Sequence, residues 1–507
     1  MLKERESIAP DHNNNYMENH KQDETLDPKD WDEMRTLMHR MVDDAVDYLS
    51  TVRERPVWQQ MPEAVMEEFK KPAPQEASSA ASVYADFKEN ILPYPMGNIH
   101  PRFWAWYMGS GTISGVMGDF WASVMNPNLG GGNHAANQVE AQVLNWMKTI
   151  MGFPQSASGL LVSGGSMANL VALTVARHQQ AGYDIRQEGI TPEVAGRMTV
   201  YASTEIHSCN QKAVEMLGMG AKSLRKIPVK ADYTIDLDAL KTQIKADRTA
   251  GMQPICIIGT PGTVNTGAID DLNALADICE AEGLWFHVDG AIGAIAMLAD
   301  NVRPQLAGIE RADSIAIDLH KWLHMPFEAG CTLVKNDAAH KNTFSLIPEY
   351  LAKKSRGIAA GNLWFSEYGP QLSRRFRALK VWMSIKEHGT ERFGRMIARN
   401  VDQAHYLGQL IEKSPVLELI APIGLDIVCF RYNPGELSLD QLNEINQEVK
   451  ILLEERGIAA PGYTTLRGVY CIRVAISNHR SRLDDFEALV EAVVSIGEEL
   501  NILSAKV

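Results

Sequence analysis

The sequence has few cysteines, and no two of them stand in a CxxC pair. The six are spread widely over the 507 residues: Cys209, Cys256, Cys279, Cys331, Cys429 and Cys471. This spacing excludes the common zinc patterns and gives no disulfide framework. Several lie in apolar runs, as in residues 255–258, which is typical of buried reduced thiols. We therefore expect no metal site and a reducing compartment.

Long apolar runs and an excess of basic residues are also absent. No uninterrupted apolar run reaches the length of a membrane-spanning helix, and the polar, acidic N-terminal stretch has no apolar signal core. Lys and Arg number 49 against 63 Asp and Glu, a net charge of −14, which argues against a nucleic acid or an anionic membrane as partner. A composition of 45% hydrophobic and 22% charged residues is usual for a globular protein. We expect a cytoplasmic location.

The apolar pattern divides the chain into four parts. Residues 1–27 are polar and are expected to form a disordered tail. Residues 28–94 form an N-terminal helical segment, in which apolar residues from Trp31 to Leu49 recur at three- and four-residue spacing, as in a helix packed on a core. Residues 95–389 form a large cofactor-binding domain, and residues 390–507 a small C-terminal α/β domain.

The large domain alternates short apolar strands with helices. This order predicts an α/β fold with a mostly parallel sheet that helices cover on both faces. The expected strands are Gly159–Val162, Thr199–Ala202, Ser223–Val229, Ile255–Gly259, Leu284–Val288, Ser314–Ile317 and Thr332–Val334. Ligands of such sheets bind beyond the carboxyl ends of the strands.

Three features stand at those strand ends. Residues 163–166 (Ser-Gly-Gly-Ser) join a strand to a helix, where glycines and free helix N–H groups can hold an anion. Asp289 ends a second strand, and Lys321 follows a third, where partial desolvation favours a free amine that can form an imine. Taken singly, these features fit a tight turn, a helix cap and a solvated lysine equally well. Together they match a pyridoxal site, with a phosphate cradle, an acid for the pyridine nitrogen and an imine-forming lysine.

Several motifs, in order, resemble the group II pyridoxal-phosphate decarboxylases, the family of aromatic-L-amino-acid, glutamate and cysteine-sulfinate decarboxylases. The resemblance covers residues 30–500, and its motifs lie at residues 100–103, 163–169, 203–208, 262–263, 287–289 and 320–322. It implies the fold type I transferase fold of pyridoxal-phosphate enzymes. It also implies a homodimer with the active site at the subunit interface, and a reaction that removes the α-carboxylate of an amino acid.

The resemblance also implies roles for individual residues. It assigns Lys321 as the Schiff-base lysine, Asp289 as the partner of the pyridine nitrogen, His207 and Ala291 to the two faces of the ring, Gly165 and Ser166 to the phosphate together with His320 and Asp318, and Thr263 to a position near the ring. Tyr350 lies in a stretch that resembles the family's mobile loop with its catalytic tyrosine. A phenol there can protonate the α-carbon, whereas aldehyde-forming relatives typically have phenylalanine, so Tyr350 favours an amine product.

The substrate is expected to be an aromatic amino acid. Trp106 and Tyr107 lie in the family's substrate-facing stretch and suit a ring, although such aromatic residues are often part of the core. His134 and Ile292 depart from the family's usual residues and could alter the pocket. The alternatives are a decarboxylase of glutamate, cysteine sulfinate or diaminobutyrate, an aldehyde-forming enzyme, or a catalytically silent scaffold.

Overall fold

The computed structural model describes residues 25–191, 193–194, 196–346 and 354–504. The chain separates into two compact units. Unit 1 is the part up to Val52 together with Pro62–Tyr94, and unit 2 contains Arg53–Met61 and everything from Pro95 onward. Among the described helices of either unit, none is both long and apolar enough to cross a membrane.

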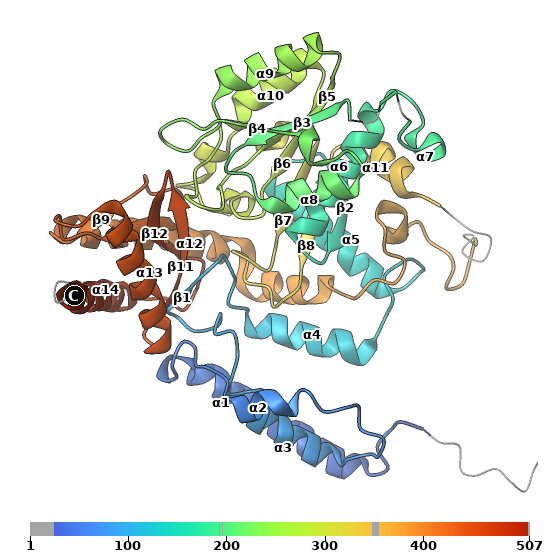
Figure 1. The fold of residues 1–507 in the computed structure, drawn as a ribbon. Helices are drawn as coiled ribbons and strands as arrows, with labels where there is room; N and C mark the ends of the chain where they lie inside the picture. The colour runs from blue at the N-terminus through green and yellow to red at the C-terminus, as the bar shows by residue number, and fades with distance from the viewer. Residues whose placement is uncertain (1–24, 192, 195, 347–353, 505–507) are drawn as a thin grey trace, which may run out of the picture. The chain divides into compact units, whose positions relative to one another are not determined.

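Unit 1 consists of helices α1 (Trp31–Ser50), α2 (Glu63–Glu68) and α3 (Ala80–Asn90), drawn in blue in Figure 1. The carboxylate of Asp44 joins α1 to α3, accepting hydrogen bonds from the Tyr84 hydroxyl (2.7 Å) and the Lys88 amine (2.8 Å). The predicted helix is confirmed, but its expected packing on a core is wrong. Leu37 is the one buried residue of α1, whereas most of its large apolar side chains are exposed. Within unit 1, α2 and α3, of 6 and 11 residues, are too short to cover the apolar face of the 20-residue α1.

The large sheet of unit 2 has the strand order β2-β8-β7-β6-β5-β3-β4. Its strands are β2 (Ser158–Val162), β3 (Met198–Ser203), β4 (Leu224–Ile227), β5 (Gln253–Gly259), β6 (Trp285–Asp289), β7 (Ser314–Asp318) and β8 (Gly330–Val334). All neighbouring pairs are parallel except those of β8, which runs antiparallel to β2 and β7. The predicted mostly parallel sheet is thus confirmed, with one reversed strand.

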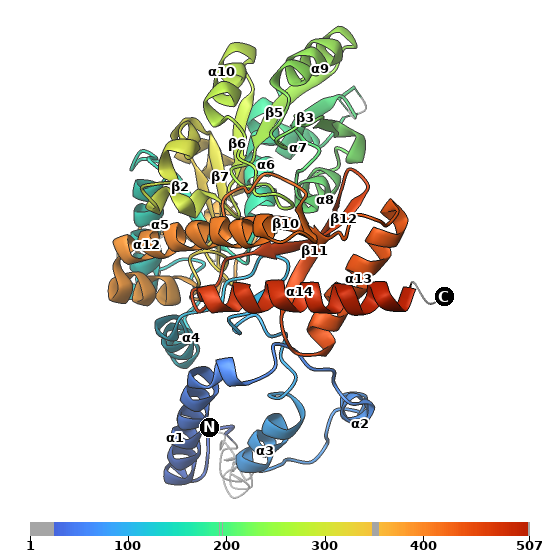
Figure 2. The same cartoon turned by 90° about the vertical axis from the view of Figure 1, so that its left-hand side faces the viewer.

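Helices cover both faces of this sheet, as Figures 1 and 2 show. In β5, Ile257 packs into one apolar core and its neighbours Cys256 and Ile258 into the other, so the strand is buried on both faces. The first core includes residues of α5 (Ala135–Ile150), α9 (Leu237–Thr249), α10 (Leu272–Glu282) and α12 (Ala378–Lys413). The second includes residues of α6 (Gly165–Gln180), α8 (Ser208–Met216) and α11 (Asp337–Phe344). Helix α4 (Ile113–Met125) lies along α12, and the short α7 (Ile185–Glu188) follows α6.

A second sheet, of order β1-β11-β12-β10-β9, forms in the C-terminal part of the chain. Its strands are β1 (Phe103–Trp104), β9 (Leu417–Leu419), β10 (Ile427–Tyr432), β11 (Ala460–Leu466) and β12 (Val469–Ala475), with α13 (Leu439–Glu455) and α14 (Leu483–Ser504) packed beside them. Because β1 pairs with β11, the chain just after Pro95 joins this sheet before it enters the large one. The segment that follows β1 therefore runs from one sheet to the other, close to the carboxyl ends of the large sheet's strands.

A buried ion pair ties the edge strand β2 to the segment before α12. Arg374 contacts the Glu140 carboxylate and donates to the carbonyls of Leu129 and Leu161 (2.9 and 2.8 Å). Both charged side chains are almost fully buried. Removing the guanidinium alone would therefore leave a buried carboxylate without its counter-charge.

Arg374→Met is expected to lower the free energy of unfolding by about 3–5 kcal/mol, because Glu140 stays buried and unpaired. Urea denaturation measures the change. The matched control is Arg375→Met, which removes an ion pair that Arg375, half exposed, makes with Asp119 (3.2 Å); its loss should cost less than about 1 kcal/mol. The double change Glu140→Gln with Arg374→Met should recover part of the loss. Equal effects of the two arginine changes would contradict this account.

Candidate functional site

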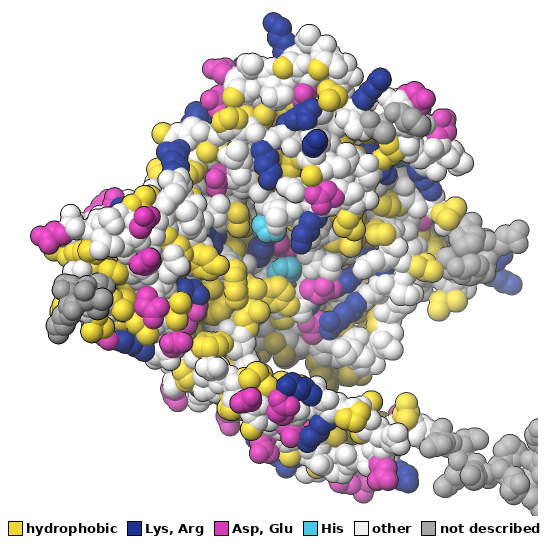
Figure 3. All heavy atoms as spheres, in the orientation of Figure 1, with side chains coloured by type: hydrophobic (Ala, Val, Ile, Leu, Met, Phe, Trp, Pro, Cys, Tyr) yellow, Lys and Arg dark blue, Asp and Glu magenta, His cyan; other side chains and the backbone are white. Residues whose placement is uncertain are grey.

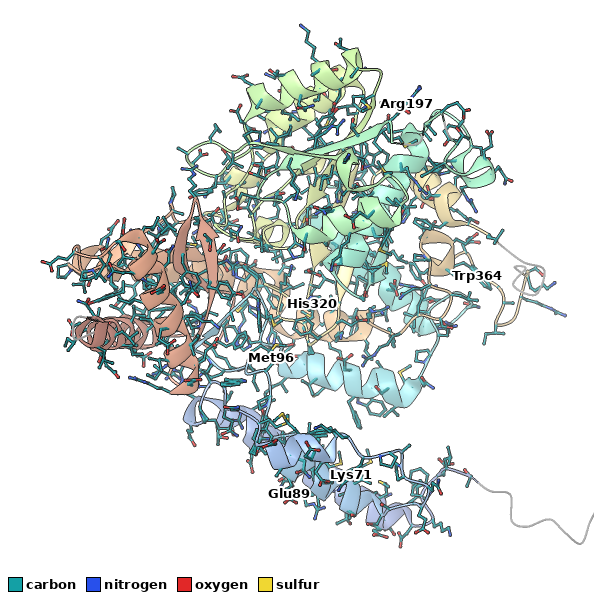
Figure 4. The ribbon with its side chains drawn as sticks, viewed as in Figure 1. Lys71, Glu89, Met96, Arg197, His320 and Trp364 are labelled. Carbon is teal, nitrogen blue, oxygen red and sulfur yellow. The ribbon has the colours of Figure 1, made fainter. Side chains whose placement is uncertain are left out.

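A cavity of about 860 Å³ lies at the carboxyl ends of the large sheet's strands. Its walls come from the ends of β2, β6 and β7, the start of α6, residues 105–107, and strands β11 and β12. Figure 3 shows a hollow here in which histidine side chains (cyan) are visible beside hydrophobic ones, and Figure 4 labels His320 between the large sheet and the C-terminal sheet. The volume is that of a site for a cofactor or a drug-sized ligand.

Asp318, the last residue of β7, connects two parts of the cavity wall: the turn that follows β7 and the start of α6. Its carboxylate lies 2.9 Å from the Lys321 amine and 3.6 Å from Nε2 of His320, and it accepts the Gly165 N–H. His320 Nδ1 accepts the Ala329 N–H (3.1 Å), so the neutral ring carries its proton on Nε2, toward Asp318. Burial lowers the pKa of His320, against the opposing effect of the Asp318 carboxylate.

The start of α6 forms an open cradle of backbone. A Cβ added at Gly165 would lie 2.7 Å from Asp318 Oδ2 and 3.2 Å from Ala291 Cβ, so the approach exists because residue 165 is glycine. The N-cap residue, Gly164, has no side chain to cap the helix; Asp318 takes the Gly165 N–H, and Ser166 is exposed beside it. Free N–H groups and a hydroxyl at a helix N-terminus are the donors that a phosphate needs.

Asp289, the last residue of β6, is almost fully buried on the cavity wall. One carboxylate oxygen accepts from Asn210 Nδ2 (2.7 Å) and the other from the Ala291 N–H (3.4 Å). A buried carboxylate needs such donors or a cation. It can therefore serve as the counter-charge of a protonated ring nitrogen in the cavity.

His207 is the N-cap of α8 and is exposed to the cavity. Its Nδ1 accepts the Cys209 N–H (3.2 Å), which leaves the proton of the neutral ring on Nε2. The surrounding walls desolvate the ring and lower its pKa, although the Asp289 carboxylate acts in the opposite direction. At neutral pH the ring is therefore uncharged and suited to stacking on a flat ligand.

Most of the predicted site residues line this one cavity: Trp106, Tyr107, Gly165, Ser166, His207, Asp289, Ala291, Asp318, His320 and Lys321. Two do not. Thr263 is fully buried, and its hydroxyl contacts Thr266 (3.0 Å) and accepts the Ala268 N–H (3.1 Å) inside a turn. His134 is the N-cap of α5, away from the described cavity wall. Tyr350 lies outside the described residues.

The sequence did not reveal Arg473, on β12. Its side chain is buried and lines the cavity, donating to the carbonyls of Trp106 and Asn265. Its Nη2 has no hydrogen-bond partner among the described residues. One signal was available: an arginine in the otherwise apolar strand Val469–Ala475 must have a reason to be buried.

The lysine, the acid and the anion cradle lie together at the carboxyl edge of a mostly parallel sheet. Their donors and charges fit pyridoxal 5′-phosphate (PLP): Lys321 would bind its aldehyde, Asp289 would pair with its ring nitrogen, and the start of α6 would hold its phosphate. These features define a PLP enzyme of fold type I.

Comparison with known proteins gives the family. The model of the pyridoxal-dependent decarboxylase conserved domain matches residues 62–433. The chain is 36% identical over 475 residues to the aromatic-L-amino-acid decarboxylase of Bacillus atrophaeus, covering 93% of this chain and 97% of that protein. The chain therefore belongs to the pyridoxal-dependent decarboxylases and is an enzyme that uses PLP to decarboxylate an amino acid.

Solved structures are similar over most of their length. The TDC of Oryza sativa, solved with PLP and tryptamine, matches with a TM-score of 0.85 and 26% identity, covering 94% of this chain and all of that chain. The glutamate decarboxylase domain of a diaminobutyrate-pyruvate transaminase and L-2,4-diaminobutyrate decarboxylase from Vibrio parahaemolyticus matches at 0.81 and 25%, covering 91% and 96%. The predicted family, fold and cofactor are confirmed, while relatives of different specificity leave the substrate open.

Gly165→Ala is expected to weaken binding of PLP about tenfold, because the new methyl group enters the space between Asp318 and Ala291. Titration of the apoprotein with PLP, followed by absorbance, measures the affinity. The circular dichroism spectrum should stay unchanged. An unaltered affinity in a correctly folded variant would contradict the phosphate cradle.

Proposed function

We propose that the chain decarboxylates an aromatic L-amino acid, of the tyrosine, tryptophan or phenylalanine type, to the corresponding amine and CO2. The observation that carries this proposal is the pairing of charges in the cavity. Lys321 faces Asp318 (2.9 Å), and Lys450 faces Glu454 (2.7 Å). In the described wall, Arg473 is then the one cation with an unpartnered nitrogen.

One unpaired cation suits a substrate with one carboxylate. An acidic amino acid would bring a second carboxylate, and a diamino acid a second ammonium, each of which needs its own partner once it is desolvated. The cavity instead offers apolar and aromatic walls, which include Trp106, Tyr107, Ile292 and Phe327. Trp106 lines the cavity and is 59% exposed, and its backbone is left-handed (φ 55°), which is unusual for a residue other than glycine. A substrate ring could cover it.

Each role in the reaction then falls to a group of this chain. Arg473 holds the α-carboxylate through Nη2, which orients the bond to be broken. Lys321 would anchor the cofactor until the substrate amine takes its place, and Asp318 would balance the charge of the freed lysine. When bound, PLP supplies an electron sink for the electron pair left when CO2 departs. Asp289 would keep the ring nitrogen protonated, and neutral His207 would cover one ring face with Ala291 on the other. The side chains of His207 and Ala291 would also exclude water from the reacting carbon.

Tyr350 is proposed as the group that delivers a proton to the α-carbon after CO2 leaves. A phenol can donate a proton there while a closed loop keeps out water. Binding of the cofactor's phosphate by Gly165, Ser166 and His320 is also part of this proposal. Thr263 and His134 keep the roles expected from the sequence only as predictions.

We further propose a homodimer in the cytoplasm. One face of α4 exposes a row of large apolar side chains: Ile113, Val116, Met117, Phe120, Trp121, Val124 and Met125. Such a contiguous apolar face is typical of a protein interface rather than of a monomer surface. The apolar face of α1 in unit 1 is exposed as well. A second copy of this chain is the proposed cover, and the six unpaired, buried cysteines fit a reducing compartment.

Product analysis by mass spectrometry tests the substrate. Purified holoenzyme is given each amino acid separately, and amine, aldehyde and CO2 are quantified. An amine from tyrosine, tryptophan, phenylalanine or a hydroxylated relative is expected, with Lys321→Ala as the inactive blank. An amine only from glutamate, cysteine sulfinate or diaminobutyrate would overturn the aromatic assignment while leaving the reaction class intact.

Tyr350→Phe is expected to lower the amine yield at least about tenfold and to divert part of the product to aldehyde, because the α-carbon loses its proton donor. Simultaneous quantification of amine and aldehyde measures the split. An unchanged amine yield would remove Tyr350 from the mechanism.

A further inference from the structure

Behind the cavity wall lies a buried acid that the reaction described above does not use. Asp426, just before β10, has no exposed surface, and its Oδ2 accepts a hydrogen bond from the Tyr107 hydroxyl (2.7 Å). Its Oδ1 has no hydrogen-bond partner in the described part of the chain. Tyr107 and Arg473 both line the cavity, whereas Asp426 does not. Asp426 can therefore affect the cavity through its hydrogen bond with Tyr107 and through its electrostatic effect on Arg473.

The neutral and ionised forms of Asp426 have similar free energies near neutral pH. An ionised carboxylate with one oxygen unpartnered is costly to bury, whereas the neutral acid is not. Burial accordingly raises the pKa of Asp426 to about 7, although the Tyr107 hydrogen bond and the Arg473 charge both oppose the rise. Burial also raises the pKa of the Tyr107 phenol well above its ordinary range, so this hydroxyl keeps its proton and remains the donor.

Arg473 is the cavity residue on which the charge of Asp426 acts. It is held by the carbonyls of Trp106 and Asn265, and the electrostatic effect of Asp426 on it favours its charged form. Among the described residues, the ionisable side chains that act on Asp426 are Tyr107 and Arg473, and Arg473 in turn faces the thiols of Cys429 and Cys471. Tyr107 also meets the neutral ring of Trp322 edge to face (6.2 Å).

We infer that Asp426 is a positioning residue whose ionisation state sets the positive electrostatic potential that Arg473 presents to the cavity. Ionisation of Asp426 weakens binding of the substrate's carboxylate. The inference rests on the proposed role of Arg473. When Asp426 is neutral, the guanidinium charge is available to the ligand. When Asp426 is ionised, its negative charge partly offsets that of the guanidinium in a buried medium of low dielectric constant. Binding is thus tight below the pKa of Asp426 and weakens as the pH rises through it.

The test measures the inhibition constant of 3-phenylpropionate against the holoenzyme from about pH 6 to about pH 8. This ligand has the ring and the carboxylate, stays ionised over the range, and has no amine that could react. For the native chain we expect about tenfold weaker inhibition at the upper end. The neutral analogue 3-phenylpropanamide should show no such trend, which separates this effect from a general change of the pocket.

Substitutions show which residue causes the pH dependence of inhibition. Asp426→Asn should bind 3-phenylpropionate tightly at both ends of the range, since the amide cannot ionise. Tyr107→Phe should move the transition to higher pH, because the lost hydrogen bond favoured the ionised carboxylate. The matched control is Asp313→Asn, which alters a partly buried acid whose pKa is also raised by burial and which lies just before β7, at the end of this strand away from the cavity. It should keep the native pH dependence.

The two proposals fail differently. If Arg473→Gln leaves the inhibition constant unchanged at all pH values, the carboxylate role of Arg473 is wrong and the inference falls with it. If Arg473→Gln weakens binding throughout, but Asp426→Asn keeps the native pH dependence, only the role of Asp426 is overturned. Should Asp426→Asn fail to fold, an unmoved transition in Tyr107→Phe overturns it equally.

Discussion

The candidate site depends on one carboxylate that two strand-end segments share, the one after β2 and the one after β7. Asp318 accepts the Gly165 N–H at the start of α6, faces the Lys321 amine and lies beside His320. One anion thus fixes the turn that would receive the phosphate relative to the lysine that would hold the aldehyde. The negative charge of Asp318 also offsets part of the cost of holding the Lys321 ammonium group at a buried strand end. Because Asp318 is itself almost fully buried, these contacts cannot be exchanged for water without loss.

Much of this arrangement could be predicted from the sequence. Strands β5, β6 and β7 are continuous apolar runs, which is what burial on both faces requires, and their carboxyl ends must meet at one edge. Asp289 and Lys321 therefore had to lie near each other. The predicted ends of β5, β6 and β7 lie within one residue of the observed ones, so the local pattern was sufficient to bring Asp289 and Lys321 to one edge.

What the sequence could not supply are contacts between distant segments. Arg473, on β12, and Asp426, just before β10, lie far along the chain, and the pairing of β1 with β11 helps to bring residues 105–107 against them. Thr263 was expected near the ring, but its hydroxyl is used inside a turn, a choice that no local pattern shows. For α1, periodicity gave the helix correctly. A periodic pattern indicates an apolar face but not what covers it, and the face is largely exposed in this chain.

The pairing of charges in the cavity also bears on how selectivity could arise. Lys321 and Lys450 already face carboxylates, and Glu328 faces Arg377 (2.7 Å), so these groups gain little by meeting a charged substrate side chain. A second charge on the substrate would have to give up its water and would find no free partner in the described wall. Discrimination would then come mainly from the cost of desolvating the wrong side chain, with the aromatic wall adding a smaller attraction. A site of this kind accepts several aromatic rings and rejects charged side chains as a class. Such a site would therefore be broad within aromatic amino acids and selective against the charged ones.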